Sequence, residues 1–182
     1  MPISQGLTRS LIATYSLGAI RIVNPWFRAV RRRMNGDSPM NISTILKSKG
    51  RQVTTVAPST TVMAVAQLLA EQRIGAVVVT GNDGQVRGIV SERDIVMAVA
   101  AGGAGRLEAR ADEIMTSNPR TCREADTIDH IMSEMTARRF RHFPVVENGA
   151  LVGIVSIGDI VKLRIAEAEM ETAAMRDYIV AR

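Results

Sequence analysis

The chain has 182 residues, of which 46% are hydrophobic and 3% aromatic, so its core must be built mainly from aliphatic side chains and Met. Cys122 is the only cysteine, which excludes an intramolecular disulfide and a zinc site made of cysteines, and fits a reducing compartment. The net charge of +5 lies entirely in residues 1–39, because residues 40–182 carry 17 basic and 17 acidic side chains. A charge-balanced main part argues against nucleic-acid binding.

Residues 1–39 form a basic arm with a broken apolar pattern. Its apolar residues fall near helical spacing, but Gly18 and Pro25 interrupt the pattern. The longest weakly polar stretch, residues 11–20, is far shorter than the roughly 20 residues of a membrane span. Three interpretations stay open: a disordered tail, a start assigned too early, and an amphipathic arm on an anionic membrane or a partner. We favour the first two over the membrane arm.

From Met40 onward the chain divides into two halves with matching patterns of elements. In the first half, apolar periodicity and turn residues predict strands over residues 53–56, 76–80 and 86–90 and helices over residues 59–72 and 92–101. In the second half, they predict strands over residues 120–122, 143–147 and 151–155 and helices over residues 127–138 and from 157 to about 180. The order is β-α-β-β-α, twice.

The repeat predicts an α/β (α+β) fold in which the two halves pack sheet to sheet, since neither half can bury both faces of its own sheet. The expected divisions are the arm at 1–39, a first domain at 40–101, a linker at 102–111, a second domain at 112–165 and a helical extension at 166–182. The last helix carries an apolar stripe that we expect a partner subunit to cover. The stripe consists of Leu163, Ala166, Met170, Ala174 and Tyr178.

One phrase occurs in both halves: GIVSERDIV at 88–96 and GIVSIGDIV at 153–161, with seven of nine positions identical. Each copy places a serine at the end of a strand and an aspartate three residues later: Ser91 and Asp94, then Ser156 and Asp159. This pattern is close to a helix capping box. A helix amino terminus can also bind phosphate, and an aspartate on its first turn can accept hydrogen bonds from ribose hydroxyls. The two interpretations are compatible.

Further motifs accompany the repeated phrase: IGAVVV at 74–79, DEIMTSNPRT at 112–121 and FRHFPVV at 140–146. With these motifs, residues 42–165 resemble a tandem pair of cystathionine β-synthase (CBS) domains, the nucleotide-sensing unit often called a Bateman module. The combination is similar to stand-alone bacterial proteins with two CBS domains and no fused enzyme or transporter.

The resemblance implies that a nucleotide binds between the halves, with Asp94 and Asp159 on ribose hydroxyls, Ser91 and Ser156 at the first phosphate, and further cationic candidates at Arg138 and Arg139. The implied ligand-contacting residues are Thr54, Thr55, Ala76, Val77, Ser91, Arg93, Asp94, Arg120, Thr121, Arg141, His142, Phe143, Pro144, Ser156 and Asp159.

The two sites should differ in affinity. Arg93 follows Ser91 closely, whereas the second copy has no arginine there. Conversely, Arg141 and His142 correspond to Gly75 and Ala76 in the first half. One site should therefore bind more tightly than the other.

We therefore expect a non-catalytic, cytoplasmic sensor that forms a homodimer and passes nucleotide occupancy to an unknown protein partner. AMP is the favoured ligand, with ATP, ADP, NAD(H) or S-adenosylmethionine as alternatives, and no metal is expected. One alternative is a tethering protein whose basic arm docks on a membrane surface or an acidic partner. Another is an enzyme acting on nucleotides, but two histidines and one cysteine supply no evident catalytic or metal-binding set.

Overall fold

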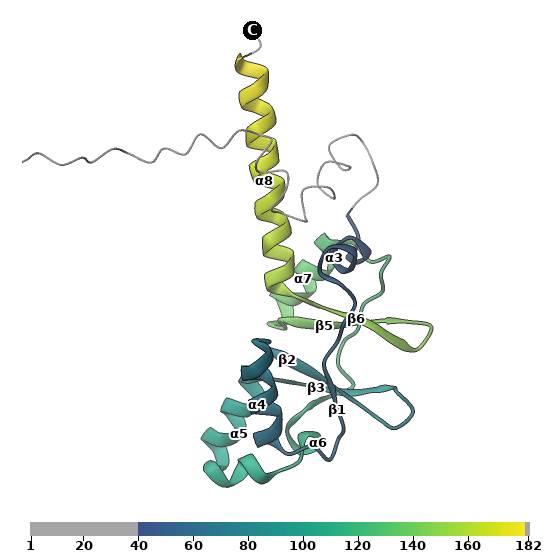
Figure 1. Cartoon of the computed structure of the whole chain (residues 1–182), viewed down its shortest axis with the longest axis vertical. Coiled ribbons are helices and arrows are strands. Elements are labelled where there is room, and N and C mark those ends of the chain that lie inside the picture. Colours follow the sequence, from purple (N-terminus) through teal and green to yellow (C-terminus); the bar gives the residue numbers. More distant parts are fainter. Residues whose placement is uncertain (1–39, 181–182) are drawn as a thin grey trace, which may run out of the picture.

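The computed structural model describes residues 40–180, so the expected basic arm lies outside the described residues, as do the side chain of Tyr178 and the last two residues. The described part contains two sheets beside one another, with helices on their outer sides and one long helix that projects away (Figure 1). This is the predicted α+β pair of repeats with an extended last helix.

The first half follows the predicted order of elements. It contains β1 (Thr55–Val56), α4 (Val62–Gln72), β2 (Ala76–Thr80), β3 (Val86–Ser91) and α5 (Glu92–Gly102). Helix α4 begins later than predicted because Thr61 caps it, its hydroxyl accepting a hydrogen bond from the Ala64 N–H. A 3₁₀ turn, η1 (Ala104–Glu108), lies within the expected linker. The segments α6 (Ala111–Ile114) and β4 (Thr116–Ser117) follow where the second domain was expected to begin, but they belong to the first half. The sheet order is β1-β2-β3-β4, with only β1 and β2 parallel.

The second half contains α7 (Ile128–Arg138), β5 (His142–Glu147), β6 (Ala150–Ser156) and α8 (Ile157–Val180). Strands β5 and β6 are antiparallel. They turn through Asn148 and Gly149, which both have positive φ as the predicted Asn-Gly turn requires.

The strand predicted at 120–122 was wrong in extent, because only Cys122 bridges Val145. In the first half, the Val78 N–H donates to the Thr54 carbonyl and extends the pairing of β1. The equivalent residue of β5 is Pro144, which has no N–H to donate. The proline therefore reduces the strand to a single bridge.

The helix α3 (Ile42–Lys49) precedes the first half but packs in the core of the second. Its Ile42, Ile45 and Leu46 are buried there with Phe143 and Leu163. The corresponding helix before the second half is α6, and it packs in the core of the first half, where Ala111 is buried. Each repeat therefore receives the helical segment that precedes the other repeat.

The repeated glycines of GIVS explain how these segments reach the sheets. A Cβ on Gly153 would lie 2.7 Å from Leu46 Cδ2, and one on Gly88 would collide with the Met115 side chain. Both glycines allow a crossing segment to press directly on the sheet.

Strand β2, in the middle of the first sheet, is buried on both faces. Val77 and Val79 point into the first core, yet Val78, on the opposite face, is also 0% exposed. The covered second face agrees with the sheet-to-sheet packing of the two halves.

Candidate functional site

The repeated Ser-x-x-Asp motifs form two helix caps with matching geometry. In α5, Asp94 Oδ2 accepts hydrogen bonds from the Ser91 N–H at 2.7 Å and the Ser91 hydroxyl at 2.6 Å. In α8, Asp159 Oδ2 accepts the same two bonds from Ser156, both at 2.8 Å. The capping interpretation is confirmed, and it leaves the Oδ1 atom of each aspartate on the first turn of its helix.

Each cap is tied to the start of a neighbouring strand. The Glu92 N–H donates to the Gly75 carbonyl at 3.2 Å, and the Ile157 N–H donates to the Arg141 carbonyl at 2.9 Å. The Asp159 N–H also donates to the Ser156 hydroxyl. These helix termini therefore offer a phosphate fewer free amides than the sequence suggested.

Strand register brings further predicted residues to the caps. Ala76 pairs with Ser91 in the first sheet, and His142 pairs with Ser156 in the second. Val77 and Phe143 are buried in the two cores, so only their backbone groups could face a ligand.

The remaining predicted residues differ in their burial and in their partners. Thr55, Arg120, Thr121 and Arg141 are exposed. The Thr54 hydroxyl donates to Gln72 Oε1. Pro144 is buried beside His142 on β5.

The two halves meet at His142. Its partly buried imidazole lies against Gly75, where a Cβ would be 3.2 Å from His142 Cε1, and Glu92 borders the same glycine. Nearby, Arg93 Nη1 is 3.5 Å from the Arg139 carbonyl oxygen of the other half. Glycine at position 75 therefore makes room for a residue of the second half.

Charged groups surround this histidine. Burial is the main cause that lowers the pKa of His142, and the charge of Arg141 lowers it further. The carboxylates of Asp159 and Glu92 act in the opposite direction. A neutral imidazole is therefore favoured where the two halves touch.

Sequence reasoning missed Lys49, the last residue of α3. Its Nζ lies 2.7 Å from Asp159 Oδ2, and both side chains are largely covered. Burial raises the pKa of Asp159, but the hydrogen bond and charge of Lys49, with the Ser156 bonds, outweigh it and hold the pKa below its ordinary value. Asp94 takes part in no ion pair among residues 40–180, so the two caps differ in charge.

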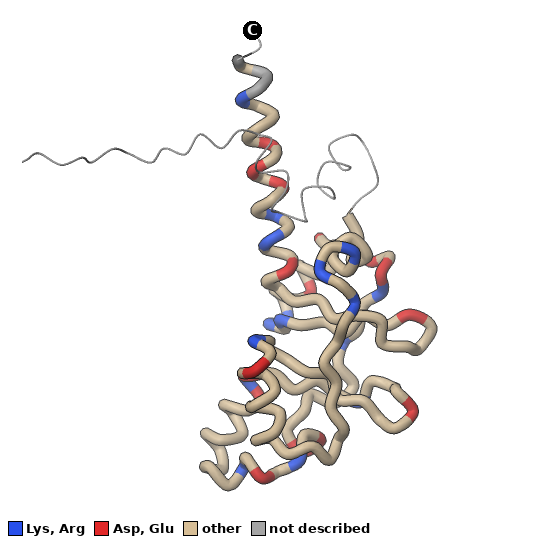
Figure 2. The backbone as a smooth tube through the Cα atoms, in the orientation of Figure 1, with Lys and Arg blue, Asp and Glu red and all other residues tan. Residues whose placement is uncertain are grey.

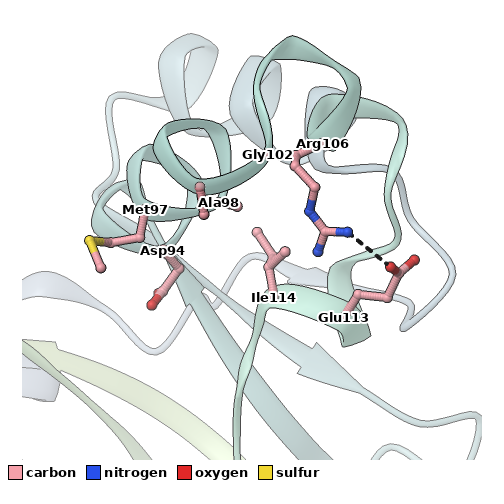
Figure 3. A pocket seen from close by; sticks show the side chains of 8 residues that line it. Asp94, Met97, Ala98, Gly102, Arg106, Glu113 and Ile114 are labelled. Carbon is pink, nitrogen blue, oxygen red and sulfur yellow. Dashed lines mark hydrogen bonds and ion pairs between the residues drawn. The ribbon is translucent and has the colours of Figure 1, made fainter.

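A shallow pocket of about 450 Å³ lies on the first half between α5, η1 and α6 (Figure 3). Of the predicted site residues, only Asp94 lines it. An ion pair between Arg106 and Glu113, 3.4 Å apart, borders the pocket. Its other lining residues are Met97, Ala98, Ala101, Gly102 and Ile114.

The described residues also bear on thiol chemistry, metal binding and membrane insertion. Cys122 is buried, and burial, followed by the charges of Asp126 and Glu147, raises the pKa of its thiol to about 12, so the thiolate is disfavoured. Within residues 40–180, no group of three or more His, Cys, Asp or Glu side chains is placed to hold a metal ion, and no helix is long and apolar enough to span a membrane.

The family model for the CBS domain matches residues 48–101 and 111–166, which together make up more than half of the chain. The chain belongs to the CBS-domain family. Its two CBS domains carry the two caps, one in each matched range, and the predicted family is thereby confirmed.

Proteins of known structure share this pair of CBS domains. A CBS-domain protein from Agrobacterium tumefaciens is 48% identical, with a TM-score of 0.67 over 68% of this chain and 92% of that one. A CBS-domain protein from Pyrobaculum aerophilum, solved with AMP, is 33% identical, with a TM-score of 0.62 over 72% of this chain and 98% of that one.

One curated relative covers nearly the whole chain. A mitochondrial CBS domain-containing protein from Arabidopsis thaliana is 26% identical over 96% of this chain and 98% of its own length.

Proposed function

We propose that this chain is a non-catalytic regulatory module that binds an adenine nucleotide between its two CBS domains. The observation that carries the proposal is the pair of matching caps, which hold Asp94 and Asp159 at equivalent strand ends on either side of the contact at His142. AMP is the favoured ligand because the similar Pyrobaculum protein was solved with AMP. ADP, ATP, NAD(H) and S-adenosylmethionine stay alternatives.

Each aspartate would recognise the ribose. Asp94 and Asp159 use Oδ2 for their caps, so Oδ1 can accept hydrogen bonds from ribose hydroxyls without breaking the cap. Backbone groups near Thr54, Ala76 and Arg120 would frame the base.

The site at Asp94 would be the tighter one. Among residues 40–180, Asp94 forms no ion pair that a ligand would have to displace, and Arg93 on the same helix turn supplies a guanidinium suited to phosphate. At the other site, the Lys49 ammonium contacts Asp159 Oδ2 and offsets the charge of the carboxylate, so Oδ1 would accept weaker hydrogen bonds from a ribose. His142 lies where the two halves touch, and it would contact phosphate from either site together with Arg141.

Nucleotide binding would act on a partner by changing the relative position of the CBS domains. Ligand contacts to both domains favour the arrangement in which those contacts form, and this is a shift of populations. The partner, a homodimeric state and a cytoplasmic location stay predictions, as does the absence of catalysis. CBS domains generally serve as regulatory modules, which supports the last of these.

Titration of the full chain with AMP, beside Asp94→Asn and Asp159→Asn, tests the proposal. Asparagine keeps the size and a capping oxygen but removes the charge. A hydrogen bond to a charged acceptor contributes about 1.5–3 kcal/mol, so Asp94→Asn should weaken the tighter site by roughly 10- to 100-fold. Asp159→Asn should affect only the weaker site.

Asp83→Asn is the control, because Asp83 lies in the exposed turn before β3, where its partners within the described residues are Arg87 and the Gln85 N–H. Equal AMP affinity in all three variants and the parent chain would contradict the proposal.

A further inference from the structure

Helix α8 has two apolar faces, and only one of them packs on its own module. Leu163 and Ala166 are buried in the second core, and Met170 packs against it. The prediction that a partner covers this stripe was therefore wrong for these residues, because α3 and α7 lie close enough to α8 to cover them. The unpartnered apolar side chains lie elsewhere on the helix.

The outer face consists of Val161, Ile165, Ala168, Thr172, Met175 and Ile179. Its four large side chains are exposed: Val161 by 47%, Ile165 by 54%, Met175 by 71% and Ile179 by 72%. The beginning of this face lies beside the module, and its end lies on the part of α8 that projects beyond the module (Figure 1).

The spacing of the outer face is that of a coiled coil. Successive members are separated by 4, 3, 4, 3 and 4 residues, which is the heptad pattern of alternating d and a positions. At 3.6 residues per turn, they fall within roughly 40° on either side of one line along the helix, and Leu163, Ala166 and Met170 lie nearly opposite. A second helix can therefore pack on this face without meeting the module behind it.

Charges beside the outer face distinguish the two possible orientations. Glu171 and Arg176 occupy g and e positions five residues apart, as do Arg164 and Glu169. In a parallel, in-register pair, Glu171 faces Arg176 of the second copy and Arg164 faces Glu169 of the second copy, so opposite charges meet. Figure 2 shows charges of both signs along α8.

An antiparallel pair built on the same face places like charges together. Ile165 then opposes Met175 of the second copy, so Glu169 meets Glu169 and Glu171 meets Glu171. The charges therefore favour the parallel arrangement. Arg164 already pairs with Asp129 and Glu167 in its own chain, so the pair of Glu171 with Arg176 decides the orientation.

We propose that the outer face of α8 pairs with the same face of a second copy of this chain as a parallel, in-register, two-stranded coiled coil. The face extends over roughly 27 Å at 1.5 Å per residue, and its middle positions hold the small Ala168 and Thr172. The dimer therefore depends on concentration. It places both modules at the same end, and it does not depend on nucleotide binding.

Cysteine cross-linking in the full chain tests the orientation directly. Met175→Cys places two thiols opposite each other only in a parallel, in-register pair, so mild oxidation should convert most of this variant to a disulfide-linked dimer. The native Cys122 gives little background because it is buried and its thiol has a pKa of about 12.

Ala174→Cys is the matched control, since Ala174 is exposed beside Met175 but points away from the outer face. Under the same oxidation it should not form a disulfide-linked dimer. Equal cross-linking of the two variants, or none of Met175→Cys alone, would overturn the proposal. Cross-linking only in a mixture of Ile165→Cys and Met175→Cys chains would indicate the antiparallel pair and also overturn it.

Molar mass in solution supplies a second readout that does not depend on oxidation. Glu171→Arg should weaken the dimer at least several-fold, and the double change Glu171→Arg with Arg176→Glu should restore it. A dimer that persists when Ile165 and Met175 are both replaced by Asp would place the contact elsewhere, for example at the exposed Val96 and Met97 of α5. None of these changes touches Asp94 or Asp159, so failure here leaves AMP binding to be judged separately.

Discussion

At the scale of single residues, the two caps have the same hydrogen bonds but different charges. Asp159 accepts hydrogen bonds from Ser156 and from Lys49, whereas Asp94 accepts only those of Ser91 among the described residues. The cap could be predicted from Ser-x-x-Asp because its partners lie three residues apart. The contact of Lys49 with Asp159 could not be predicted, because the two residues lie 110 positions apart and meet only through the packing of α3.

Replacing Lys49 tests this difference. Because the folded-state pKa of Asp159 lies below its ordinary value, its ionised form stabilises the fold above the ordinary pKa, and this stability is lost as the pH falls through the lowered pKa. Lys49→Met should lower the free energy of unfolding by at most about 1 kcal/mol at pH 7, since the pair is partly exposed. Denaturant unfolding of both chains should show the difference vanishing at acidic pH.

Lys47→Met, on the exposed side of the same helix, serves as the control and should change the stability less. If Lys49→Met is as stable as the parent chain at pH 7, the ion pair contributes nothing. In the same variant, AMP should bind the weaker site more tightly, because the Lys49 charge no longer weakens the Asp159 carboxylate as a hydrogen-bond acceptor.

At the scale of elements, local patterns predicted most helices and strands, while tertiary packing decided the rest. Local residues indicate two helices and one turn: Thr61 and Thr127 cap the helices, and Asn148-Gly149 forms the turn. Helix α3 is only eight residues long, and its side chains are buried by the second domain, from which the whole first domain separates it along the chain. The strand lost at Arg120 depended on Pro144, which lies on a different strand.

The close approach of α3 to the second sheet should make Gly153 sensitive to substitution. Gly153→Ala places a Cβ 2.7 Å from Leu46 Cδ2, and such overpacking costs about 1–3 kcal/mol of unfolding free energy. Gly105→Ala is the control, because nothing lies within 4 Å of its Cβ position. Thermal or denaturant unfolding measures both.

Leu46→Ala combined with Gly153→Ala should cost less than the two single changes added together, since the two side chains compete for one space. Strict additivity would show that Gly153 does not make room for Leu46.

At the scale of the whole molecule, the two CBS domains are joined by more than their linker. Helix α3 precedes the first domain and packs on the second, so a movement between the domains must also move α3 or the Lys49 contact with Asp159. The repeat and the family could be predicted from sequence, because two similar phrases 65 residues apart are visible without coordinates. The packing of α3 on the second domain could not be predicted, because no local pattern indicates which domain a short helix joins.

The central claim is that the paired CBS domains bind an adenine nucleotide. Isothermal titration of the full chain with AMP tests it most directly, followed by ADP, ATP, NAD, NADH and S-adenosylmethionine. The account predicts saturable binding of AMP, with one tighter site per chain and a weaker second one. No binding of any of these ligands would contradict the account and leave Ser91–Asp94 and Ser156–Asp159 as helix caps alone.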